Sequence, residues 1–206
     1  MSEYIDYGFN DSSPSHTFFY LYQPLLALLN KDKNQYILDL GCGNGHLVNY
    51  LNEQGYNVYG TDASEKGIAI AKETKPDRFF VQDLSTNKLP VELQKIKFDT
   101  IISTEVIEHL YDPEGFIIFC KEALKGKGEL IISTPYHGYL KNLTLSIFNK
   151  WDAHLGPTWH GGHIKFWSRK TLSQLLTDVG FVVTDFKGCG RMPYFYKSMV
   201  IKAKLP

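Results

Sequence analysis

The 206-residue sequence predicts an α/β fold, built on a doubly wound, mostly parallel sheet of seven strands. Short apolar runs alternate with segments of helical periodicity, which is typical of a parallel sheet covered by helices on both faces. The first apolar run ends at a glycine-rich turn, Gly41 to Gly45, that leads directly into a helical pattern. The last two runs, 181–186 and 198–204, have no helix between them, so we expect an antiparallel pair of strands at one edge.

Residues 1–34 are expected to form an N-terminal arm and a helix ahead of the sheet. The polar and aromatic residues 1–16 fit an arm that packs over a ligand and a frayed tail equally well. Apolar side chains recur at helical spacing over 17–29. Within that stretch Pro24 is expected to kink the helix or to begin a second one.

Residues 35–206 are expected to form one domain, because the alternation continues to the end of the chain. The strands are predicted at 35–40, 57–62, 78–82, 98–103, 129–134, 181–186 and 198–204. The helices between them are predicted at 44–54, 64–74, 112–124 and 168–179. Residues 136–167 show no strand pattern, so we interpret them as an insertion after the fifth strand.

Composition argues against several classes of partner. Lys plus Arg and Asp plus Glu number 22 each, so no net charge draws the chain to nucleic acid, and none is expected as a partner. The three cysteines lack metal-ligand spacing, which favours the reducing cytoplasm. The sequence shows neither a signal-peptide pattern nor an apolar run of about 18 residues, so we expect no membrane span.

The glycine turn is the strongest functional signal. A helix that begins at such a turn offers free N–H groups and the positive end of its dipole to a ligand. A dinucleotide fingerprint has a third glycine where this chain has His46, so that alternative explains little beyond the first glycines and Asp62. The string Asp39-Leu-Gly-Cys-Gly-Asn-Gly-His-Leu47 closely resembles motif I of the class I S-adenosylmethionine (SAM)-dependent methyltransferases. The resemblance covers residues 35–206, weakly over 136–167.

This resemblance implies a Rossmann-like sheet in which the seventh strand is antiparallel and lies between the fifth and sixth. It also implies a SAM site. Asp62 ends a strand and is placed to accept both hydrogens of a ribose diol, although it is also suited to cap a helix. Asp83, with the Leu84 backbone beside it, resembles the acid that contacts the adenine amino group, although it also suits a turn. The cofactor-binding residues are expected to be Asp39, Gly41, Cys42, Gly43, Gly45, Asp62, Ala63, Asp83, Leu84 and Glu105.

Methyl transfer to a hydroxyl group needs alignment and a base, and histidine is the natural base near neutral pH. Each histidine is also compatible with a surface or structural role. The candidate bases are His109, His137, His160 and His163.

A divalent cation is a further hypothesis. If Glu105, Glu108 and His109 lie on a helical turn, their spacing places all three on one face, where they would hold a metal ion that binds the acceptor. The stretch 105–113 resembles the ubiquinone-biosynthesis O-methyltransferases, which carry a similar Glu-x-x-Glu-His and are metal-linked. Without a metal, Glu105 would border the cofactor, and the other two would pack internally or line the acceptor pocket.

The insertion 136–167 is expected to cover the substrate. Leu140, Leu143, Ile147 and Trp151 recur at helical spacing, which fits a lid helix packed on the domain or an interfacial helix. In the second case 139–151 would contact a membrane surface peripherally. The sequence as a whole predicts a SAM-dependent methyltransferase acting on a small-molecule acceptor, most readily an O-methyl acceptor such as a phenol or quinol. A SAM-binding regulatory protein or pseudo-enzyme without turnover is the alternative.

Overall fold

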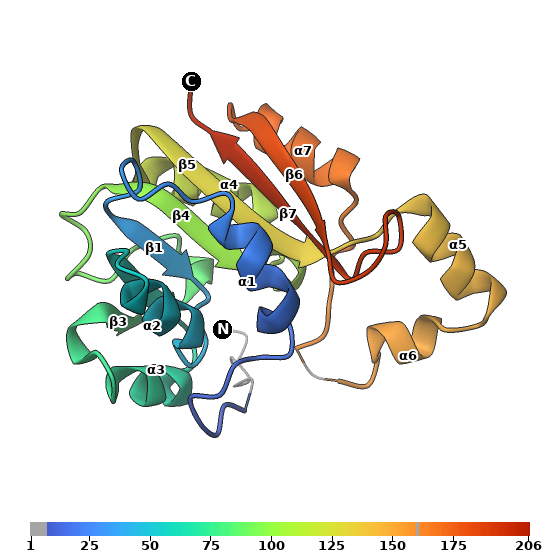
Figure 1. Cartoon of the computed structure of the whole chain (residues 1–206), viewed down its shortest axis with the longest axis horizontal. Helices are drawn as coiled ribbons and strands as arrows, with labels where there is room; N and C mark the ends of the chain where they lie inside the picture. Colours follow the sequence, from blue (N-terminus) through green and yellow to red (C-terminus); the bar gives the residue numbers. More distant parts are fainter. Residues whose placement is uncertain (1–7, 160) are drawn as a thin grey trace.

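A seven-stranded sheet forms the centre of the structure, which is a computed structural model that describes residues 8–159 and 161–206 (Figure 1). The strand order is β3-β2-β1-β4-β5-β7-β6. The strands are β1 (Ile37–Leu40), β2 (Val58–Asp62), β3 (Phe79–Val81), β4 (Phe98–Thr104), β5 (Leu124–Pro135), β6 (Val182–Cys189) and β7 (Ser198–Lys204).

The pairing of the strands confirms the predicted fold class. Strand β1 pairs in parallel with both β2 and β4, whereas β7 pairs antiparallel with both β5 and β6. The antiparallel pair therefore lies at one edge of the sheet, as expected. The strand order reverses between β1 and β4, and ligands of doubly wound sheets bind at such a switch point, beyond the carboxyl ends of the strands.

Helices cover both faces of the sheet, as Figure 1 shows. They are α1 (Phe18–Leu26), α2 (His46–Glu53), α3 (Glu65–Lys72), α4 (Pro113–Ala123), α5 (Tyr139–Ile147), α6 (Trp151–Leu155) and α7 (Arg169–Asp178). Short 3-10 turns occur at η1 (Pro76–Arg78), η2 (Leu84–Thr86) and η3 (Ile107–His109). Among the described helices, none is long and apolar enough to cross a bilayer.

The core divides into clusters on the two faces, because side chains alternate along each strand. Leu38 and Leu40 of β1 belong to the cluster that contains the buried residues of α4 and α7. Ile37 belongs to the cluster under α2 and α3, which Leu25 of α1 also joins. Asp39 alternates with Leu38 and Leu40, so it shares the face of Ile37 and is a carboxylate inside the sheet layer.

Several element boundaries differ from the predicted ones. Helix α1 continues through Pro24 and ends two residues later, without a second helix, because a proline in the last turn removes only one terminal hydrogen bond. Strand β5 begins at Leu124 rather than at 129, since its first residues already pair with β4 around a register shift. The insertion contains two short helices, α5 and α6, so Leu140 and Trp151 belong to different helices.

Candidate functional site

The turn after β1 requires glycine at three positions. Gly41, Gly43 and Gly45 have φ angles of +82°, +56° and +76°, in the left-handed region that a residue with a Cβ rarely adopts. A Cβ on Gly45 would lie 2.5 Å from Ala71 and 2.7 Å from Phe79. The absence of a side chain at Gly45 therefore allows α2 to begin directly against the sheet. Gly45 has this packing role one residue before His46, where the motif departs from the dinucleotide pattern.

Cys42 lies in the middle of the turn and is buried. Its backbone N–H donates to the carbonyl of Thr61 at 2.9 Å, and a Cβ on Gly60 would approach its Sγ within 2.8 Å. Burial, followed by the charges of Asp39 and Asp62, raises the pKa of the thiol well above its usual range. Cys42 is thus a small packing residue and a poor nucleophile.

Two carboxylates, Asp39 and Asp62, flank the turn. Asp39 is 1% exposed, and within the described residues neither of its oxygens has a hydrogen-bond partner. Burial, and secondly the charge of Asp62, raises the pKa of Asp39 to about 8. Asp62 accepts hydrogen bonds at 2.8 Å from the N–H groups of Gly43 and Ser64, one at each oxygen. A carboxylate oxygen can accept more than one hydrogen bond, so these two contacts are compatible with binding of a ribose diol by Asp62.

The described part of the N-terminal arm packs on the glycine turn. The Asn44 side chain donates to the carbonyls of Asp11 and Ser13 at 2.8 Å each. The ring of Phe9 lies where a Cβ on Gly43 would be, 2.7 Å from that position. These residues therefore pack on the glycine turn, whereas packing over a ligand stays a prediction. Tyr4 and Tyr7 lie outside the described part of the chain.

Three further cofactor residues follow β2 and β3 at the same edge of the sheet. Asp83 is exposed and accepts from the N–H of Ser85 at 2.8 Å, so it caps η2. Leu84 is the next residue in the chain, and Ala63 follows the neighbouring strand β2; both are half-buried. Their contact with an adenine ring stays a prediction, and Asp83 retains one carboxylate oxygen for it.

Glu105 follows β4 in a strained conformation, with a φ of +56°. Its carboxylate accepts from the hydroxyl groups of Ser133 at 2.8 Å and Ser198 at 3.0 Å. The hydroxyl of Tyr20 lies 3.5 Å from that of Ser198. Burial raises the pKa of Glu105 to about 7. The side chain therefore belongs to a network that joins α1, β5 and β7.

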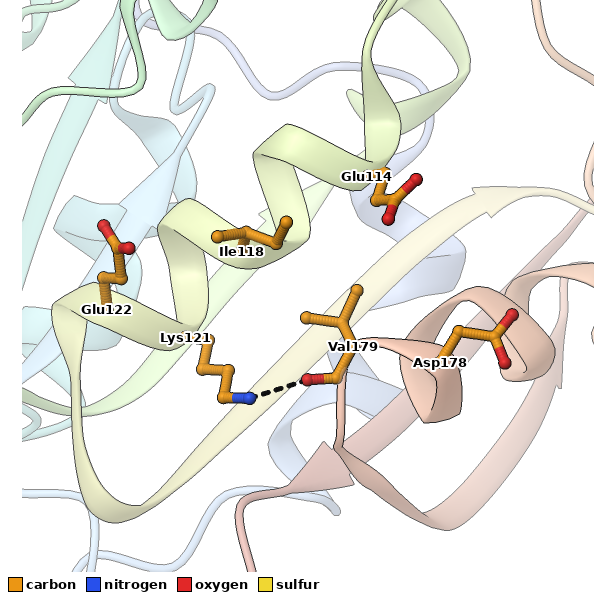
Figure 2. A pocket seen from close by; sticks show the side chains of 6 residues that line it. All are labelled: Glu114, Ile118, Lys121, Glu122, Asp178 and Val179. Atoms are coloured by element: carbon orange, nitrogen blue, oxygen red, sulfur yellow. Dashed lines mark hydrogen bonds between the residues drawn. The ribbon is translucent and has the colours of Figure 1, made fainter.

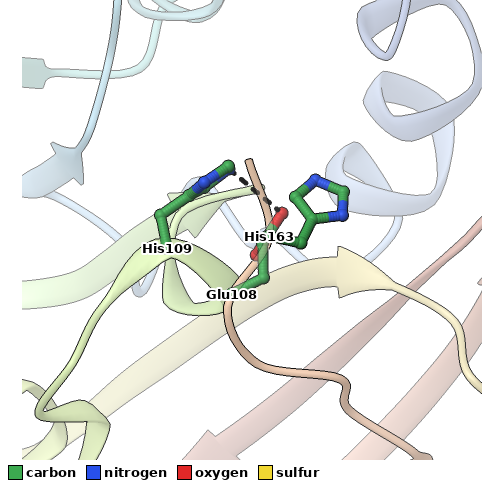
Figure 3. A group of neighbouring side chains, drawn as sticks. All are labelled: Glu108, His109 and His163. Atoms are coloured by element: carbon green, nitrogen blue, oxygen red, sulfur yellow. Dashed lines mark ion pairs between the residues drawn. The ribbon is translucent and has the colours of Figure 1, made fainter. Parts of the chain in front are cut away.

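Glu108, His109 and His163 form a separate cluster beyond β4 (Figure 3). One potential ligand atom from each of the three lies within 4.8 Å of the others. Glu108 is 1% exposed, and its Oε2 accepts from the hydroxyl of Thr134 at 2.9 Å. Its Oε1 has no hydrogen-bond partner among the described residues and lies 3.9 Å from His109 Nε2.

Backbone contacts hold the His109 ring and the turn that carries it. Nδ1 of His109 lies 3.3 Å from the carbonyl oxygen of Gly162. A carbonyl only accepts, so Nδ1 carries the proton and Nε2 keeps a lone pair. The N–H groups of Ile164 and Lys165 donate to the carbonyl of Glu108 at 2.9 and 3.0 Å. The end of the insertion is therefore held directly over η3.

The structure changes the predicted metal set. The sequence spacing placed Glu105, Glu108 and His109 on one face, but residues 107–109 form a 3-10 turn and Glu105 precedes it with a left-handed backbone. The Glu105 side chain consequently lies among serine hydroxyl groups, and His163 takes the third position beside Glu108 and His109. The spacing argument for Glu105 was wrong because it assumed an α-helical turn.

His137, another candidate base, is not part of this cluster. His137 lies in another group, with its ring parallel to that of Trp151 at a centroid distance of 6.4 Å and 5.5 Å from the ring of His154. His160 lies outside the described residues. A cavity of about 570 Å³ lies between α4 and the end of α7 (Figure 2). At this cavity Lys121 donates to the carbonyl of Val179 at 2.7 Å. That cavity contains none of the predicted site residues, so it does not bear on their chemistry.

The class of protein follows from comparison with known sequences. A profile of the methyltransferase-domain family matches residues 15–185, so the chain belongs to that family. This confirms the predicted class, a SAM-dependent methyltransferase of the class I fold.

More particular relatives are ubiquinone biosynthesis O-methyltransferases. The protein from Rickettsia canadensis is 29% identical over 82% of this chain and 72% of its own length. The human mitochondrial protein is 30% identical over 77% of this chain and 44% of its own length. The chain thus spans less than two thirds of the length of several relatives, including one from Dinoroseobacter shibae at 64%.

Solved structures share the fold. Magnesium protoporphyrin IX methyltransferase from Synechocystis, determined with bound SAH, superposes with a TM-score of 0.66 at 23% identity, covering 90% of this chain and 80% of that one. A methyltransferase in complex with the Trm112 activator of Haloferax volcanii gives a TM-score of 0.70 at 16% identity, over 90% and 88% of the two chains.

Sequence reasoning missed several residues of the site. Ser133 and Ser198 lie inside strands, and Tyr20 lies on a helix that precedes the sheet, so nothing local distinguishes them from packing residues. Lys141 is a polar residue of a surface helix, where exposure to water is the rule, yet it is 6% exposed. Asn44 offered a usable signal, because its amide in a glycine turn is well suited to hold a neighbouring backbone segment.

Proposed function

We propose that this chain transfers the methyl group of SAM to a hydroxyl group of a small-molecule acceptor of the phenol or quinol type. The observation that carries the proposal is the position of the glycine turn and Asp62 at the same sheet edge as the imidazole of His109. The names of the relatives, ubiquinone biosynthesis O-methyltransferases, support oxygen as the methylated atom. SAM supplies an electrophilic methyl group on a sulfonium centre.

The residues at the turn fit SAM. The buried carboxyl group of Asp39 has no hydrogen-bond partner among the described residues, and once a bound cation has favoured the loss of its proton it gives this edge, with Asp62, a negative potential. A ligand that carries a sulfonium and an ammonium group compensates that potential. Asp62 would receive the ribose hydroxyl groups, and the positive-φ glycines allow the backbone to approach the ligand closely.

The acceptor hydroxyl must lose one proton as its oxygen attacks the methyl carbon. Among the four candidate bases, His109 is best placed, because its Nδ1–H faces the Gly162 carbonyl and leaves Nε2 as the acceptor. It also lies just past β4, next to the strand that carries the glycine turn. His163, with its ring centroid 5.0 Å from that of His109, would orient the acceptor or share the proton.

A divalent cation is compatible with the same cluster. One carboxylate oxygen and two imidazoles form a ligand set that suits Zn²⁺, Mn²⁺ or Fe²⁺ better than it suits Mg²⁺. Mg²⁺ prefers ligands that are all oxygen atoms. The unpartnered Oε1 of Glu108 fits that role. In this arrangement Glu108, His109 and His163 would hold the ion, which supplies Lewis acidity toward the acceptor oxygen. His109 would then bind the ion in place of acting as the base.

The insertion supports a covering and an interfacial role. Its second half is hydrogen-bonded over η3, where it would exclude water from the methyl group. Helix α5 presents apolar side chains outward, which favours the interfacial interpretation over a packed lid. These outward residues, each between 41% and 77% exposed, are Tyr139, Leu140, Leu143 and Ile147, followed by Phe148 after the helix. We infer that they contact the lipid phase that delivers an apolar acceptor.

The decisive experiment is a calorimetric titration with SAM and, separately, with NAD, followed by a screen of phenol, amine and carboxylate acceptors. Asp62→Ala should weaken SAM binding by roughly tenfold to a few hundredfold, the value of one or two charge-assisted hydrogen bonds. Asp32→Ala, at an exposed acid in the turn before β1, is the matched control and should leave affinity unchanged.

Three outcomes separate the alternatives. SAM binding with methylation of a hydroxyl acceptor supports the proposal. SAM binding without turnover on any acceptor class favours the regulatory or pseudo-enzyme alternative. Tight NAD binding without SAM binding would remove the assignment altogether.

A further inference from the structure

Helix α5 places a lysine on its inner side. Lys141 is 6% exposed, whereas Leu140 and Leu143 on either side of it are 42% and 41% exposed. An amphipathic surface helix normally has the opposite arrangement, with apolar residues inward and lysine in water. A lysine buried in this way has a purpose other than solubility.

The ammonium group of Lys141 is poorly satisfied. Its Nζ donates to the carbonyl of Lys197 at 3.2 Å, and within the described residues no carboxylate lies within ion-pair distance of it. An ammonium group has three donors, so the other two have no partner among the described residues. The carbonyl that accepts from Lys141 belongs to Lys197, whose N–H donates to the carbonyl of Cys189 at 2.8 Å, just before Arg191 in the connection between β6 and β7. Burial, and secondly the charge of Arg191, lower the pKa of the ammonium group, whereas the charge of Glu105 raises it.

Unpartnered polar atoms of the insertion lie around this lysine. His137 is 7% exposed, and its Nε2 has no hydrogen-bond partner among the described residues. The Nε2 of His154 is likewise buried without one. The N–H of Tyr136 donates at 3.1 Å to the same Lys197 carbonyl that accepts from Lys141, so the ammonium group lies next to the chain segment that carries His137. Its charge also lowers the pKa of both rings, after the larger effect of burial. Two imidazoles and an ammonium group thus share a partly desolvated space.

Aromatic side chains form walls of the same space. The ring of His137 is parallel to that of Trp151, with 5° between the planes, and its centroid is 5.1 Å from that of Phe166. Trp151 also contacts His154 edge-on at 6.2 Å. A flat ligand can pack against such aromatic walls, and an anionic group on that ligand can contact the ammonium group of Lys141.

We propose that Lys141, with Arg191 as a second charge and the Nε2 atoms of His137 and His154 as hydrogen-bonding groups, binds an anionic group of the methyl acceptor, a carboxylate or a phosphate. This inference rests on the proposed methyltransferase function and defines its acceptor as charged at one end. The order of the strands favours the acceptor, rather than the cofactor, as the molecule that carries the anionic group. Lys141 reaches β7, which is separated from β1 and its glycine turn by β4 and β5.

The test uses the protein loaded with SAH and two probes that differ only in a carboxylate, 3,4-dihydroxybenzoate and catechol, together with inorganic phosphate as a competitor. Calorimetry should show the carboxylate probe binding at least tenfold more tightly than catechol, the order expected of a charge-assisted contact in a desolvated site. Phosphate should compete with it. Lys141→Met should remove the difference between the probes, while Lys141→Arg should retain most of it.

Lys150→Met is the matched control, because Lys150 is an exposed lysine of the same insertion, and it should change neither affinity. Thermal unfolding verifies that the variants are folded. The comparison of the two probes on the unmodified protein decides the question even if Lys141→Met does not fold.

The remaining outcomes overturn the inference. Equal binding of the two probes, absence of binding by both anions, or an unchanged preference in Lys141→Met would each contradict it. If Lys141→Met weakens SAH but not 5′-methylthioadenosine, which lacks the amino-acid carboxylate, the anion belongs to the cofactor. A protein that binds no SAH at all refutes the proposed function, whereas normal SAH binding without anion preference refutes only the charged acceptor.

Discussion

The contribution of Asp39 to the free energy of unfolding of the cofactor-free protein should fall as pH rises from about 4 to about 8. Burial and the charge of Asp62 raise the pKa of this acid from its ordinary 3.8 to about 8. Between these values the folded protein holds a proton that the unfolded chain has released. Unfolding then releases a proton, so rising pH favours the unfolded chain. The penalty is absent below the unfolded pKa and complete above the folded one.

The magnitude follows from the interval between the two pKa values. At pH 7 the solution is 3.2 units above the ordinary value of 3.8, and each unit corresponds to about 1.4 kcal/mol. Protonating Asp39 in the fold therefore costs about 4 kcal/mol at neutral pH, as an order of magnitude. An asparagine has nearly the shape of the protonated acid and needs no proton. Asp39→Asn should accordingly stabilise the cofactor-free protein at pH 7 and change little near pH 4.

Urea unfolding at pH 5, 6, 7 and 8, without SAM, measures this effect. The unmodified protein should lose up to about 1.4 kcal/mol more per pH unit than Asp39→Asn over this range. Asp32→Asn, at an exposed acid, is the control and should keep the dependence of the unmodified protein. Parallel pH dependences for the unmodified protein and Asp39→Asn would show that the carboxylate is solvated or paired in solution, and the reasoning would be refuted.

Two further predictions concern the cation and the outward face of α5. If Glu108, His109 and His163 hold a metal ion, exhaustive chelation should lower turnover at least tenfold, and added Mn²⁺ or Zn²⁺ should restore it. In the Glu108→Gln variant the added ion should not restore turnover. Full activity of the chelated protein would contradict the metal site. The double change Ile147→Glu and Phe148→Glu should weaken sedimentation with anionic phospholipid vesicles at least tenfold, since each exposed side chain contributes about 1.5–3 kcal/mol if it is buried in lipid. Val91→Glu, at a 74% exposed residue in the loop before β4, is the control, and equal sedimentation of all variants would remove the membrane role.

The parts of the fold that the sequence predicted well are those with local signals. The glycine turn requires positive φ angles at Gly41, Gly43 and Gly45, and only glycine meets that requirement cheaply. Strand and helix periodicities predicted all seven strands, because each element buries one side against the sheet. Three predicted helices begin at residues whose side chains accept a backbone N–H of the first turn, namely Ser64, Asp112 and Ser168.

The parts that escaped prediction depend on contacts between distant segments. His163 reaches His109 across the whole insertion, and no spacing rule connects two residues so far apart in the chain. The direction of Glu105 depends on one left-handed backbone angle that its sequence context does not announce. Lys141 faces inward because the helix that carries it packs by its polar side, which reverses the usual rule on amphipathic helices.

The insertion is closed at its base, since the N–H of His137 donates to the carbonyl of Trp167 at 3.0 Å and Glu108 holds the strand-like segment just before it. A loop whose ends already meet can change length at small entropic cost, because closure entropy grows only slowly with the number of residues. Residues 138–166 are therefore joined to the sheet at two junctions that lie close together. If this segment selects the acceptor, as proposed above, a laboratory graft at the same two junctions should change the acceptor while SAM binding is retained.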